Sequence, residues 1–305
     1  IQPNDKIDGK FLFYRIQTEK KQIENMASAT TVSIVNKSKF EKTKITYPES
    51  LSAQSAIVSA IETQFTRLDA SVKALKSVQQ KLEIYRKAVL KKAFEKREGW
   101  EEKRIGEVCI INPSKIEVKD LDEKLEVSFI PMAYVSEEGK IMKMDKKYLK
   151  EVNKGFTFFK NNDVLLAKIT PCFENGKKAI ADKLINGIGF GTTEFYVFRP
   201  NNEVISKWIY YNISREDFRA LAKRSMGGAV GQQRVSKDMI ENFKISVPSI
   251  SEQTLIVQSI ESKFSVIDKV AEAVDKGLAK AERLRKAILK YAFEGKLVRM
   301  EEVSK

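Results

Sequence analysis

Several short motifs in this chain contain residue types that carry out chemistry in other proteins. Glu117-Val-Lys119 resembles the end of a metal-dependent nuclease site, which needs a second carboxylate upstream to hold its ion. No suitable Asp lies shortly before this triplet, and Asp120 and Asp122 behind it indicate a solvated, charged turn. Asn112-Pro113-Ser114 stops short of the Asn-Pro-Pro-aromatic motif with which amino-methyltransferases hold a target base. We therefore predict neither nuclease nor methyl-transfer chemistry here.

Two glycine-containing motifs have some features of nucleotide-binding loops. Gly187-Ile-Gly-Phe-Gly191 lacks the third glycine of a dinucleotide-binding turn and precedes a strand-like run instead of a helix. Gly176-Lys177 resembles the end of a phosphate-binding loop, but no glycine lies five residues before Gly176. We expect no cofactor to be bound by this chain.

The composition narrows the possible chemistry further. The sequence contains no histidine and two cysteines, Cys109 and Cys172, which excludes His-activated nucleophiles and His-rich metal sites within these residues. Two cysteines without a metal-binding spacing predict buried thiols in a reducing compartment. No apolar run approaches the roughly 18 residues of a membrane-spanning helix, so we expect a cytoplasmic protein with no membrane partner.

The chain is strongly basic. Lys and Arg outnumber Asp and Glu by 55 to 41, which gives a formal net charge of +14. Such an excess favours a polyanionic partner. The middle of the chain is nearly balanced, however, because residues 99–247 carry 25 basic and 21 acidic side chains. Nucleic-acid binding by that segment would need a local basic patch.

A long internal repeat organises the chain. Arg86-Lys-Ala-Val-Leu-Lys-Lys-Ala-Phe-Glu95 returns as Arg285-Lys-Ala-Ile-Leu-Lys-Tyr-Ala-Phe-Glu294, and residues 51–95 align with 250–294 at many further positions. A weaker match extends upstream, from Met26–Pro48 to Met226–Pro248. Two equivalent segments therefore bracket a different segment between them.

Both copies predict a long amphipathic helix. Residues 52–98 contain neither proline nor glycine and carry an apolar stripe at three-four spacing, which the second copy repeats with Gly277 inside it. A proline-led turn with a capping serine precedes each helix, at Pro48 and Pro248, and a glycine follows each. Because neither rod can bury its stripe alone, we expect the two helices to form an antiparallel coiled coil.

Residues 99–247 predict an α+β domain with a β-rich core. A helix is expected over Val204–Lys223, followed by a glycine-rich loop over Met226–Gln233. The strands are expected over Arg104–Ile111, Val127–Tyr134, Gly155–Phe159, Asp163–Ile169, Lys177–Ala181, Phe190–Phe198 and Asn242–Val247.

The first residues repeat only the end of this pattern. Phe11–Ile23 is expected as a helix, Ala27–Thr31 as a loop and Ile45–Tyr47 as a strand. We therefore expect the chain to begin inside a first domain, and residues 1–45 to be poorly ordered or aggregation-prone because they cannot form a complete core. The predicted segments are a domain remnant over 1–47, a spacer helix over 48–98, a complete domain over 99–247, a second spacer helix over 248–296 and a tail over 297–305.

This combination of segments resembles one known family. The helices contain Gln54-Ser-Ala-Ile-Val58 and Gln253-Thr-Leu-Ile-Val257 and end in the repeated decapeptide. The domain between them contains Asp163-Val-Leu-Leu-Ala-Lys-Ile-Thr-Pro-Cys-Phe-Glu-Asn-Gly-Lys177, and the segments 100–108 and 187–198 fit as well. The chain is similar to the specificity subunit of a type I restriction-modification enzyme, without the front of its first domain.

The resemblance implies a non-catalytic subunit of a site-specific deoxyribonuclease and adenine methyltransferase complex. In this family two target-recognition domains each read half of a bipartite double-stranded DNA sequence, and the helices fix their separation. Two methyltransferase subunits would dock around the helices, and a restriction subunit with motor activity would join them. The resemblance places S-adenosylmethionine, ATP and Mg²⁺ in those partners and no cofactor in this chain.

Three polar loops are the expected DNA-reading elements, because base edges are read by Arg, Lys, Asn, Gln, Ser and Thr side chains. In this interpretation Glu174 accepts from a cytosine amine, Gln232 or Gln233 binds adenine, and Arg234 binds guanine or a phosphate. The alternative for each loop is structural: its glycines turn the chain and its lysines are solvated charges. The candidate residues are Lys168, Thr170, Glu174, Asn175, Lys177, Lys178, Thr192, Thr193, Gln232, Gln233, Arg234 and Ser236.

The ends of the two helices are the expected docking sites for partner subunits. Phe94 and Phe293 could instead close the coil. The candidates are Arg86, Lys87, Lys91 and Phe94 in the first copy and Arg285, Lys286, Lys290 and Phe293 in the second.

Two other interpretations remain open from the sequence. The chain could serve a methyltransferase-nuclease fusion of type II character, or it could be a coiled-coil scaffold that carries an incidental α+β domain. DNA binding in complex with a methyltransferase would distinguish the scaffold from both specificity subunits.

Overall fold

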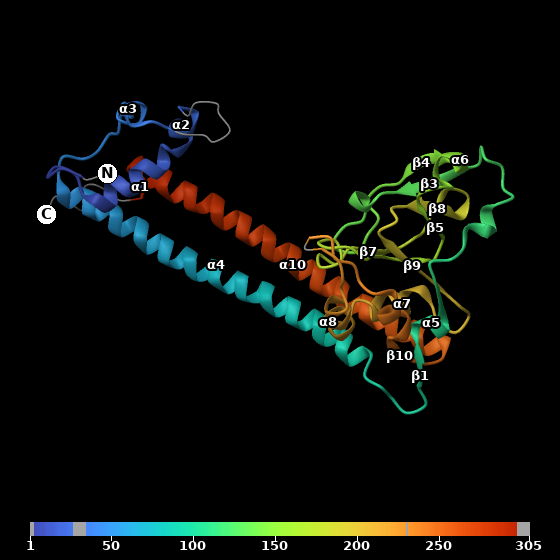
Figure 1. The fold of residues 1–305 in the computed structure, drawn as a ribbon. Coiled ribbons are helices and arrows are strands. Elements are labelled where there is room, and N and C mark those ends of the chain that lie inside the picture. The colour runs from blue at the N-terminus through green and yellow to red at the C-terminus, as the bar shows by residue number, and fades with distance from the viewer. Residues whose placement is uncertain (1–2, 27–34, 230, 298–305) are drawn as a thin grey trace. The chain divides into compact units, whose positions relative to one another are not determined.

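The computed structural model describes residues 3–26, 35–229 and 231–297, which belong to two compact units (Figure 1). The first unit comprises residues 1–83 and 267–305, and the second comprises residues 84–266. Two long helices, α4 (Leu51–Ala93) and α10 (Ile250–Phe293), contribute residues to both units. The predicted fold class, an α+β domain with two long paired helices, is confirmed. In the described part of the chain, no helix combines the length and apolar character needed to cross a membrane.

The first unit is helical, and its core lies between α4, α10 and a short helix α1 (Gly9–Thr18). Gly277 of α10 lies so close to α4 that an added Cβ would be 3.1 Å from Cδ1 of Leu75. Arg285 forms an ion pair with Asp69 across the two helices. The buried side chains are Phe11, Ile57, Val58, Ile61, Phe65, Leu68, Ala281, Ile288, Leu289 and Ala292.

The start of the chain differs from its prediction. Residues 1–45 were expected to be poorly ordered, but Phe11 is 1% exposed in the core of the first unit. The predicted helix is divided into α1 and α2 (Lys20–Asn25), and a further turn of helix, α3, covers Lys37–Phe40. No strand forms over residues 45–47, because these residues have no neighbouring strand with which to pair. The loop predicted over Ala27–Thr31 lies outside the described residues.

Both long helices begin where the prolines and serines predict. Ser50 accepts a hydrogen bond from the backbone of Ala53, and Ser249 accepts one from Glu252, in each case at 3.3 Å. Gly295 follows the end of α10 closely with φ of +71°, a conformation that favours glycine. Gly99 does not end α4, which stops at Ala93; its φ of +81° belongs to the turn before the next strand.

The second unit contains two four-stranded sheets and one strand pair. In the first sheet, β2 (Cys109–Ile111), β9 (Phe195–Pro200), β6 (Val164–Ala167) and β7 (Lys178–Ile180) are antiparallel in that order. In the second sheet the order is β4 (Asp145–Tyr148), β3 (Glu126–Ile130), β8 (Ile188–Gly191) and β5 (Thr157–Lys160), with β3 and β8 parallel. The remaining pair is β1 (Glu101–Arg104) with β10 (Lys244–Val247).

Short helices connect these strands and cover the first sheet. The longer ones are α7 (Ser206–Asn212), α8 (Glu216–Arg224) and α9 (Lys237–Asn242), and α7 packs on β6, β7 and β9. Single turns of helix form α5 (Ile105–Val108), η1 (Lys115–Val118), η2 (Met132–Tyr134), α6 (Leu149–Val152) and η3 (Ile185–Gly187).

Predicted elements of the second unit are also divided in the structure. The strand expected over Arg104–Ile111 is interrupted by α5, where Glu107 accepts from the backbone of Arg104 and begins a helical turn. The strand expected over Phe190–Phe198 is two strands separated by a turn at Thr192–Glu194. The helix expected over Val204–Lys223 breaks into α7 and α8 at Arg215, whose backbone is extended.

Two strands, β1 and β4, were missed because they lack the alternating apolar pattern of a half-buried strand. The residues of β4, Asp145–Tyr148, are mostly exposed at the edge of the second sheet. There backbone pairing with β3 can form without apolar side chains.

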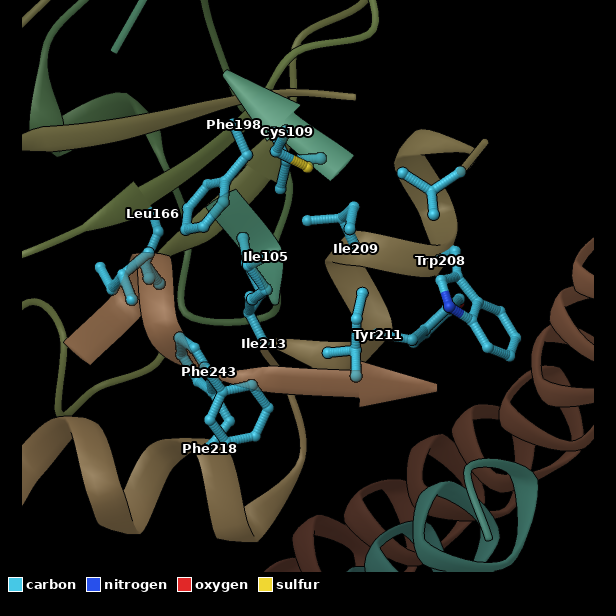
Figure 2. Close-up of a cluster of buried hydrophobic side chains, with 14 of the residues drawn as sticks. Ile105, Cys109, Leu166, Phe198, Trp208, Ile209, Tyr211, Ile213, Phe218 and Phe243 are labelled. Carbon is cyan, nitrogen blue, oxygen red and sulfur yellow. The ribbon is translucent and has the colours of Figure 1, made fainter. Parts of the chain in front are cut away.

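The main core of the second unit lies between the first sheet and helices α7, α8 and α9 (Figure 2). Trp208 is fully buried, and its indole N–H donates to the backbone oxygen of Ser246 at 3.1 Å. Cys109 is buried in the same cluster as predicted, and burial raises the pKa of its thiol to about 12. This thiol is therefore protonated at neutral pH and unreactive. Cys172 is only half-buried.

Candidate nucleic-acid interface

Three loops that are distant in the sequence meet in the second unit. The segment after β6 begins with Lys168, whose backbone N–H donates to the oxygen of Glu194 at 2.9 Å and whose oxygen accepts from Val235 at 2.9 Å. Thr170 bonds to Gln233 twice, through its backbone N–H at 3.0 Å and through its hydroxyl at 3.1 Å. These contacts bring together Lys168, Thr170, Gln233 and the Thr192–Glu194 turn. We use the name three-loop surface for these residues together with residues 227–229 and 231–236.

Residues 227–229 and 231–234 belong to a tight reversal of the chain. Gly227 and Arg234 exchange backbone hydrogen bonds at 3.1 and 2.9 Å. Gly228 and Gly231 have φ values of +116° and +80°, which L-residues with side chains rarely adopt. These two glycines therefore turn the chain. The turn leaves Gln232 exposed and Gln233 half-buried.

An ion pair that the sequence did not indicate holds the middle of this surface. The Glu194 carboxylate accepts from Arg234 through Nη2 at 2.8 Å and through Nε at 3.0 Å. This hydrogen bonding lowers the pKa of Glu194, so the side chain is a carboxylate at neutral pH. Forty positions separate the two residues in the chain, and no periodicity or motif links them.

Lys168 and the threonines lie next to this pair. The Lys168 ammonium is 5.4 Å from the ring centroid of Tyr196, a cation–π distance. The Tyr196 hydroxyl donates to the backbone oxygen of Val235 at 2.9 Å, so this tyrosine supports two of the loops. The Thr192 hydroxyl accepts from the backbone of Glu194, whereas Thr193 is exposed. Tyr196 escaped notice in the sequence because it lies within an apolar strand.

The part of the first loop beyond Pro171 has protein partners for most of its candidate side chains. Glu174 pairs with Lys223 at 2.7 Å, and Asn175 donates to the Glu137 carboxylate at 2.7 Å. The Lys177 ammonium donates to the backbone oxygen of Met132 at 3.2 Å. These side chains hold the loop against η2, against the segment that follows η2 and against α8.

Lys178 and Ser236 lie outside the exposed part of the surface. Lys178 belongs to β7, half-buried, with its ammonium 5.2 Å from the ring centroid of Tyr210. Burial, with Arg219 and Arg86 nearby, lowers the pKa of Lys178 to about 8. Ser236 is the N-cap of α9, where its hydroxyl accepts from the backbone of Met239 at 3.4 Å. Both residues thus have structural contacts.

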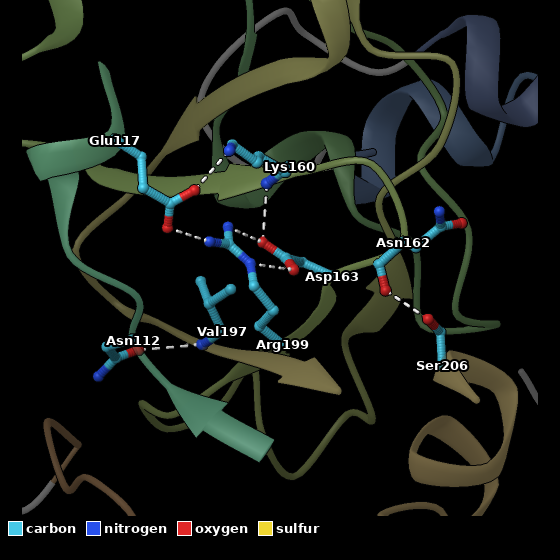
Figure 3. Close-up of polar contacts among 8 residues, drawn as sticks. All are labelled: Asn112, Glu117, Lys160, Asn162, Asp163, Val197, Arg199 and Ser206. Carbon is cyan, nitrogen blue, oxygen red and sulfur yellow. Dashed lines mark hydrogen bonds and ion pairs between the residues drawn. The ribbon is translucent and has the colours of Figure 1, made fainter. Parts of the chain in front are cut away.

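A polar network near the opposite ends of these strands joins the two sheets (Figure 3). Arg199 of β9 donates to both oxygens of the buried Asp163, at 2.9 and 2.7 Å, and to Glu117 at 2.5 Å. The Glu117 side chain was expected in a solvated turn, but it is paired with Arg199 and Lys160. Asn112 accepts from the backbone of Val197 at 3.0 Å. Among the described residues, no group of His, Cys, Asp or Glu is arranged to hold a metal ion.

Residues 1–82 and 97–270 match the family model for the type I restriction modification DNA specificity domain. The chain belongs to this family. It is 40% identical over 183 residues to the type I restriction enzyme EcoAI specificity subunit of Escherichia coli, a match that covers 59% of this chain and 31% of that one. It is 22% identical to the StySPI specificity subunit of Salmonella potsdam over 94% of this chain and 64% of that one.

Solved structures share the fold at lower identity. A chain from a study of complex assembly and conformational transition of the type I R-M system gives a TM-score of 0.76 at 19% identity, over 97% of this chain and 74% of that one. The HsdS subunit from Thermoanaerobacter tengcongensis gives 0.55 at 19% identity, over 95% and 71%. The matched region spans only 31% and 30% of the two Escherichia coli relatives, EcoAI and EcoEI.

The family expected from the sequence is thereby confirmed. The prediction that the chain is not itself an enzyme agrees with the relatives, which are named as specificity subunits.

The predicted docking residues of this family member divide into exposed and buried ones. Lys91 and Lys87 are both exposed, and Lys87 pairs with Glu216 at 2.9 Å. Phe94 was predicted to be exposed, but it is 5% exposed and packs on Trp208 with ring centroids 4.6 Å apart. The guanidinium of Arg86 lies 4.5 Å from the ring centroid of Phe264.

The second set repeats this division in the first unit. Lys286 is exposed and Lys290 pairs with Glu294 at 3.7 Å. Phe293 is half-buried, with its ring edge-on to Phe11 at 5.3 Å. Arg285 lies 4.3 Å from the ring centroid of Phe65. Phe293 thus packs against the helical core of the first unit, whereas Phe94 packs in the main core of the second unit.

A groove of about 350 Å³ in the second unit lies between the end of α4 and the start of α10. Its lining includes the apolar Val89, Ile256 and Ile260 and the basic Lys92, Arg97 and Lys263. Sequence periodicity did not indicate this groove. Its apolar residues were expected in the coiled coil, and its basic residues were expected on the solvated face of the helices.

Proposed function

We propose that the second unit is a target-recognition domain that reads one half of a bipartite sequence in double-stranded DNA. The proposal rests on one observation: three loops far apart in the sequence converge through the backbone hydrogen bonds of Lys168 and Thr170. The three-loop surface presents amide, hydroxyl and cationic groups together, and these are the groups that bind base edges and phosphates. Membership of the specificity family supports the same function.

The contacts refine the roles proposed for individual residues. Gln232 is exposed on the turn and is the better placed of the two glutamines to bind an adenine edge. Lys168 and Arg234 supply positive charge for phosphate or guanine. Glu174, Asn175 and Lys177 already bind protein groups, so their role in this proposal is to shape the loop.

The long helices would connect this domain to its partners. In this proposal α4 and α10 fix the distance between two half-site readers, so that two modest interactions act as one selective interaction. Two methyltransferase subunits dock along the helices at exposed positions such as Lys91 and Lys286, and a restriction subunit joins that complex. S-adenosylmethionine, ATP and Mg²⁺ belong to those partners. The five segments over 1–47, 48–98, 99–247, 248–296 and 297–305 describe this organisation.

The proposal is tested by co-expressing the chain with a methyltransferase subunit with which it forms a stable complex and mapping methylated bases in host DNA. We expect one new methylated motif that is absent with empty vector. Gln232→Ala should relax that motif at one base pair, whereas Gln80→Ala, at an exposed glutamine of α4, should leave it unchanged. A stable purified complex that methylates no new site would overturn the proposal and favour a structural scaffold.

A further inference from the structure

We infer that Glu194 is a positioning residue for sequence readout, because it holds the guanidinium of Arg234 in one orientation on the three-loop surface. This inference rests on the proposed function. Glu194 does not have to touch a base in this role. It would determine which donors of Arg234 remain available to DNA, and it would limit how strongly the surface binds DNA of any sequence.

The contacts of Arg234 leave its side chain little freedom. Nε and Nη2 donate to the Glu194 carboxylate at 3.0 and 2.8 Å, and Nη1 donates to the backbone oxygen of Gln232 at 3.0 Å. Each of the three guanidinium nitrogens therefore donates one hydrogen bond within the protein, and one N–H on each of Nη1 and Nη2 remains. A planar group held in this way directs its remaining N–H bonds along fixed lines, which is what bidentate recognition requires.

Both side chains remain accessible to a large ligand. The exposed fractions are 44% for the Arg234 side chain and 24% for the Glu194 side chain. An ion pair on the surface contributes little to folding stability. The Arg234–Glu194 pair can therefore serve DNA binding, and a variant that lacks it should still fold.

The backbone of Glu194 fixes the position from which its carboxylate acts. Its N–H donates to the Thr192 hydroxyl at 3.2 Å, and its oxygen accepts from Lys168 at 2.9 Å. The residue therefore contacts all three loops, two through the backbone and one through the side chain. No other candidate of the three-loop surface combines a backbone position at the junction with a charge opposite to Arg234.

The charge of Glu194 also affects binding that does not depend on sequence. The charges of Arg234 and Lys168 both stabilise the ionised form of this carboxylate and lower its pKa. The carboxylate reduces the attraction that these cations exert on the phosphate backbone. Replacing it with a neutral amide should strengthen binding to any DNA while it weakens discrimination between sequences.

The test compares Glu194→Gln, Glu194→Asp and Arg234→Gln in the chain purified with its methyltransferase. Glu126→Gln is the matched control, because Glu126 pairs with Lys146 at 2.8 Å in β3, outside the three loops. Affinity is measured at several salt concentrations for the cognate duplex, for duplexes with single base-pair substitutions and for an unrelated duplex. Thermal unfolding of each variant checks that the fold is retained.

We expect Glu194→Gln to lose about tenfold in discrimination at one base pair and to bind the unrelated duplex more tightly. The salt dependence of binding should steepen by roughly one released ion. Glu194→Asp keeps the charge and should retain part of the discrimination. The double variant Glu194→Gln with Arg234→Gln should discriminate no worse than Arg234→Gln alone, because both act through one group.

The inference would be overturned if Glu194→Gln discriminated between duplexes as well as the wild-type chain at every base pair. It would also be overturned if the double variant lost discrimination equal to the sum of the losses in Glu194→Gln and Arg234→Gln. A wild-type complex that binds all duplexes equally would instead overturn the proposed function itself. The two failures are therefore distinguishable in one experiment.

Discussion

Gln54 and Gln253 make the same three hydrogen bonds in the two units. The amide oxygen of Gln54 accepts from the backbone of Asp8 at 2.7 Å, and that of Gln253 accepts from Ile205 at 3.0 Å. Each amide nitrogen donates to two backbone oxygens, one of them that of the proline before its helix. Both side chains are fully buried. Each glutamine thus ties the start of a long helix to the residues that precede a short one.

This equivalence extends to the short helices that follow. Lys10 pairs with Glu62 in the first unit, as Lys207 pairs with Glu261 in the second. The aromatic pairs also repeat, as Tyr14 with Phe65 and Tyr211 with Phe264. Helix α1 therefore occupies in the first unit the place that α7 occupies in the second. Both helices lie upstream of Met26 and Met226, where the aligned repeat begins.

Gln253→Ala should destabilise the second unit by about 2–4 kcal/mol, because it leaves one buried N–H and two buried carbonyl groups without their partner. Urea unfolding followed by circular dichroism would measure the change. Gln258→Ala is the control, since Gln258 is exposed on the same helix, and it should change stability by less than about 0.5 kcal/mol. A change of similar size in both variants would contradict the role given to these hydrogen bonds.

Gly191→Ala should destabilise the sheet that contains β8. A Cβ at this position would lie 2.5 Å from the backbone oxygen of Ile130 and 3.1 Å from Cε2 of Phe195, and overpacking of this kind costs about 1–3 kcal/mol. Gly227→Ala is the comparison, because nothing lies within 4 Å of a Cβ there. The midpoint of thermal unfolding should fall for the first variant only; an equal fall for both would contradict the packing argument.

Lys178 should make stability depend on pH in a definite window. Its pKa is lowered to about 8 from 10.5, so between these values the unfolded chain binds a proton that the folded chain does not. Stability relative to Lys178→Met should therefore rise with pH across this window, by up to about 3 kcal/mol. Below pH 8 the full penalty remains, and the methionine variant should be the more stable protein.

Chemical unfolding of both proteins at several pH values checks this expectation. The difference between the two isolates Lys178 from other groups that titrate in the same range. A difference that stays constant from pH 7 to pH 10.5 would show that the folded lysine titrates like a solvated one.

Phe94→Ala and Lys91→Glu should separate packing from docking at the end of α4. Phe94 packs on Trp208 in the core, so its truncation should cost about 3–5 kcal/mol. Lys91 is exposed, so its reversal should leave stability unchanged and reduce co-purification with a methyltransferase subunit. Unfolding curves and pull-down yields of both variants provide the check; a stable Phe94→Ala protein that fails to dock would reverse the assignment.

Sequence periodicity predicted the long helices well because their residues repeat one local pattern. The absence of proline and glycine predicts an uninterrupted helix. The three-four spacing around Ile57 and Ile61 predicts which face of that helix is buried. The same reasoning failed at Arg104–Ile111 and Phe190–Phe198, where apolar residues lie on both sides of a turn. There the break is set by contacts from distant residues, as when the N–H of Ile105 bonds to Phe243.

The candidate surface was predictable at the level of loops and less so at the level of side chains. Glycines and polar residues correctly marked the turn at residues 227–236. They did not indicate that Ser236 caps a helix, that Lys178 lies in a strand or that Glu174 pairs with Lys223. Each of these outcomes depends on a partner that is remote in the chain.

The sequence by itself determined that two long helices exist, that they are copies of one another and that a different α+β domain lies between them. Those properties depend on local propensity and on the period of apolar residues, which neighbouring residues carry. Only the tertiary structure decided that Gln54 and Gln253 make equivalent hydrogen bonds and that Glu194 pairs with Arg234. Hydrogen bonds and ion pairs between distant segments form only when the backbone has brought their atoms within about 3 Å, and no local pattern records that approach.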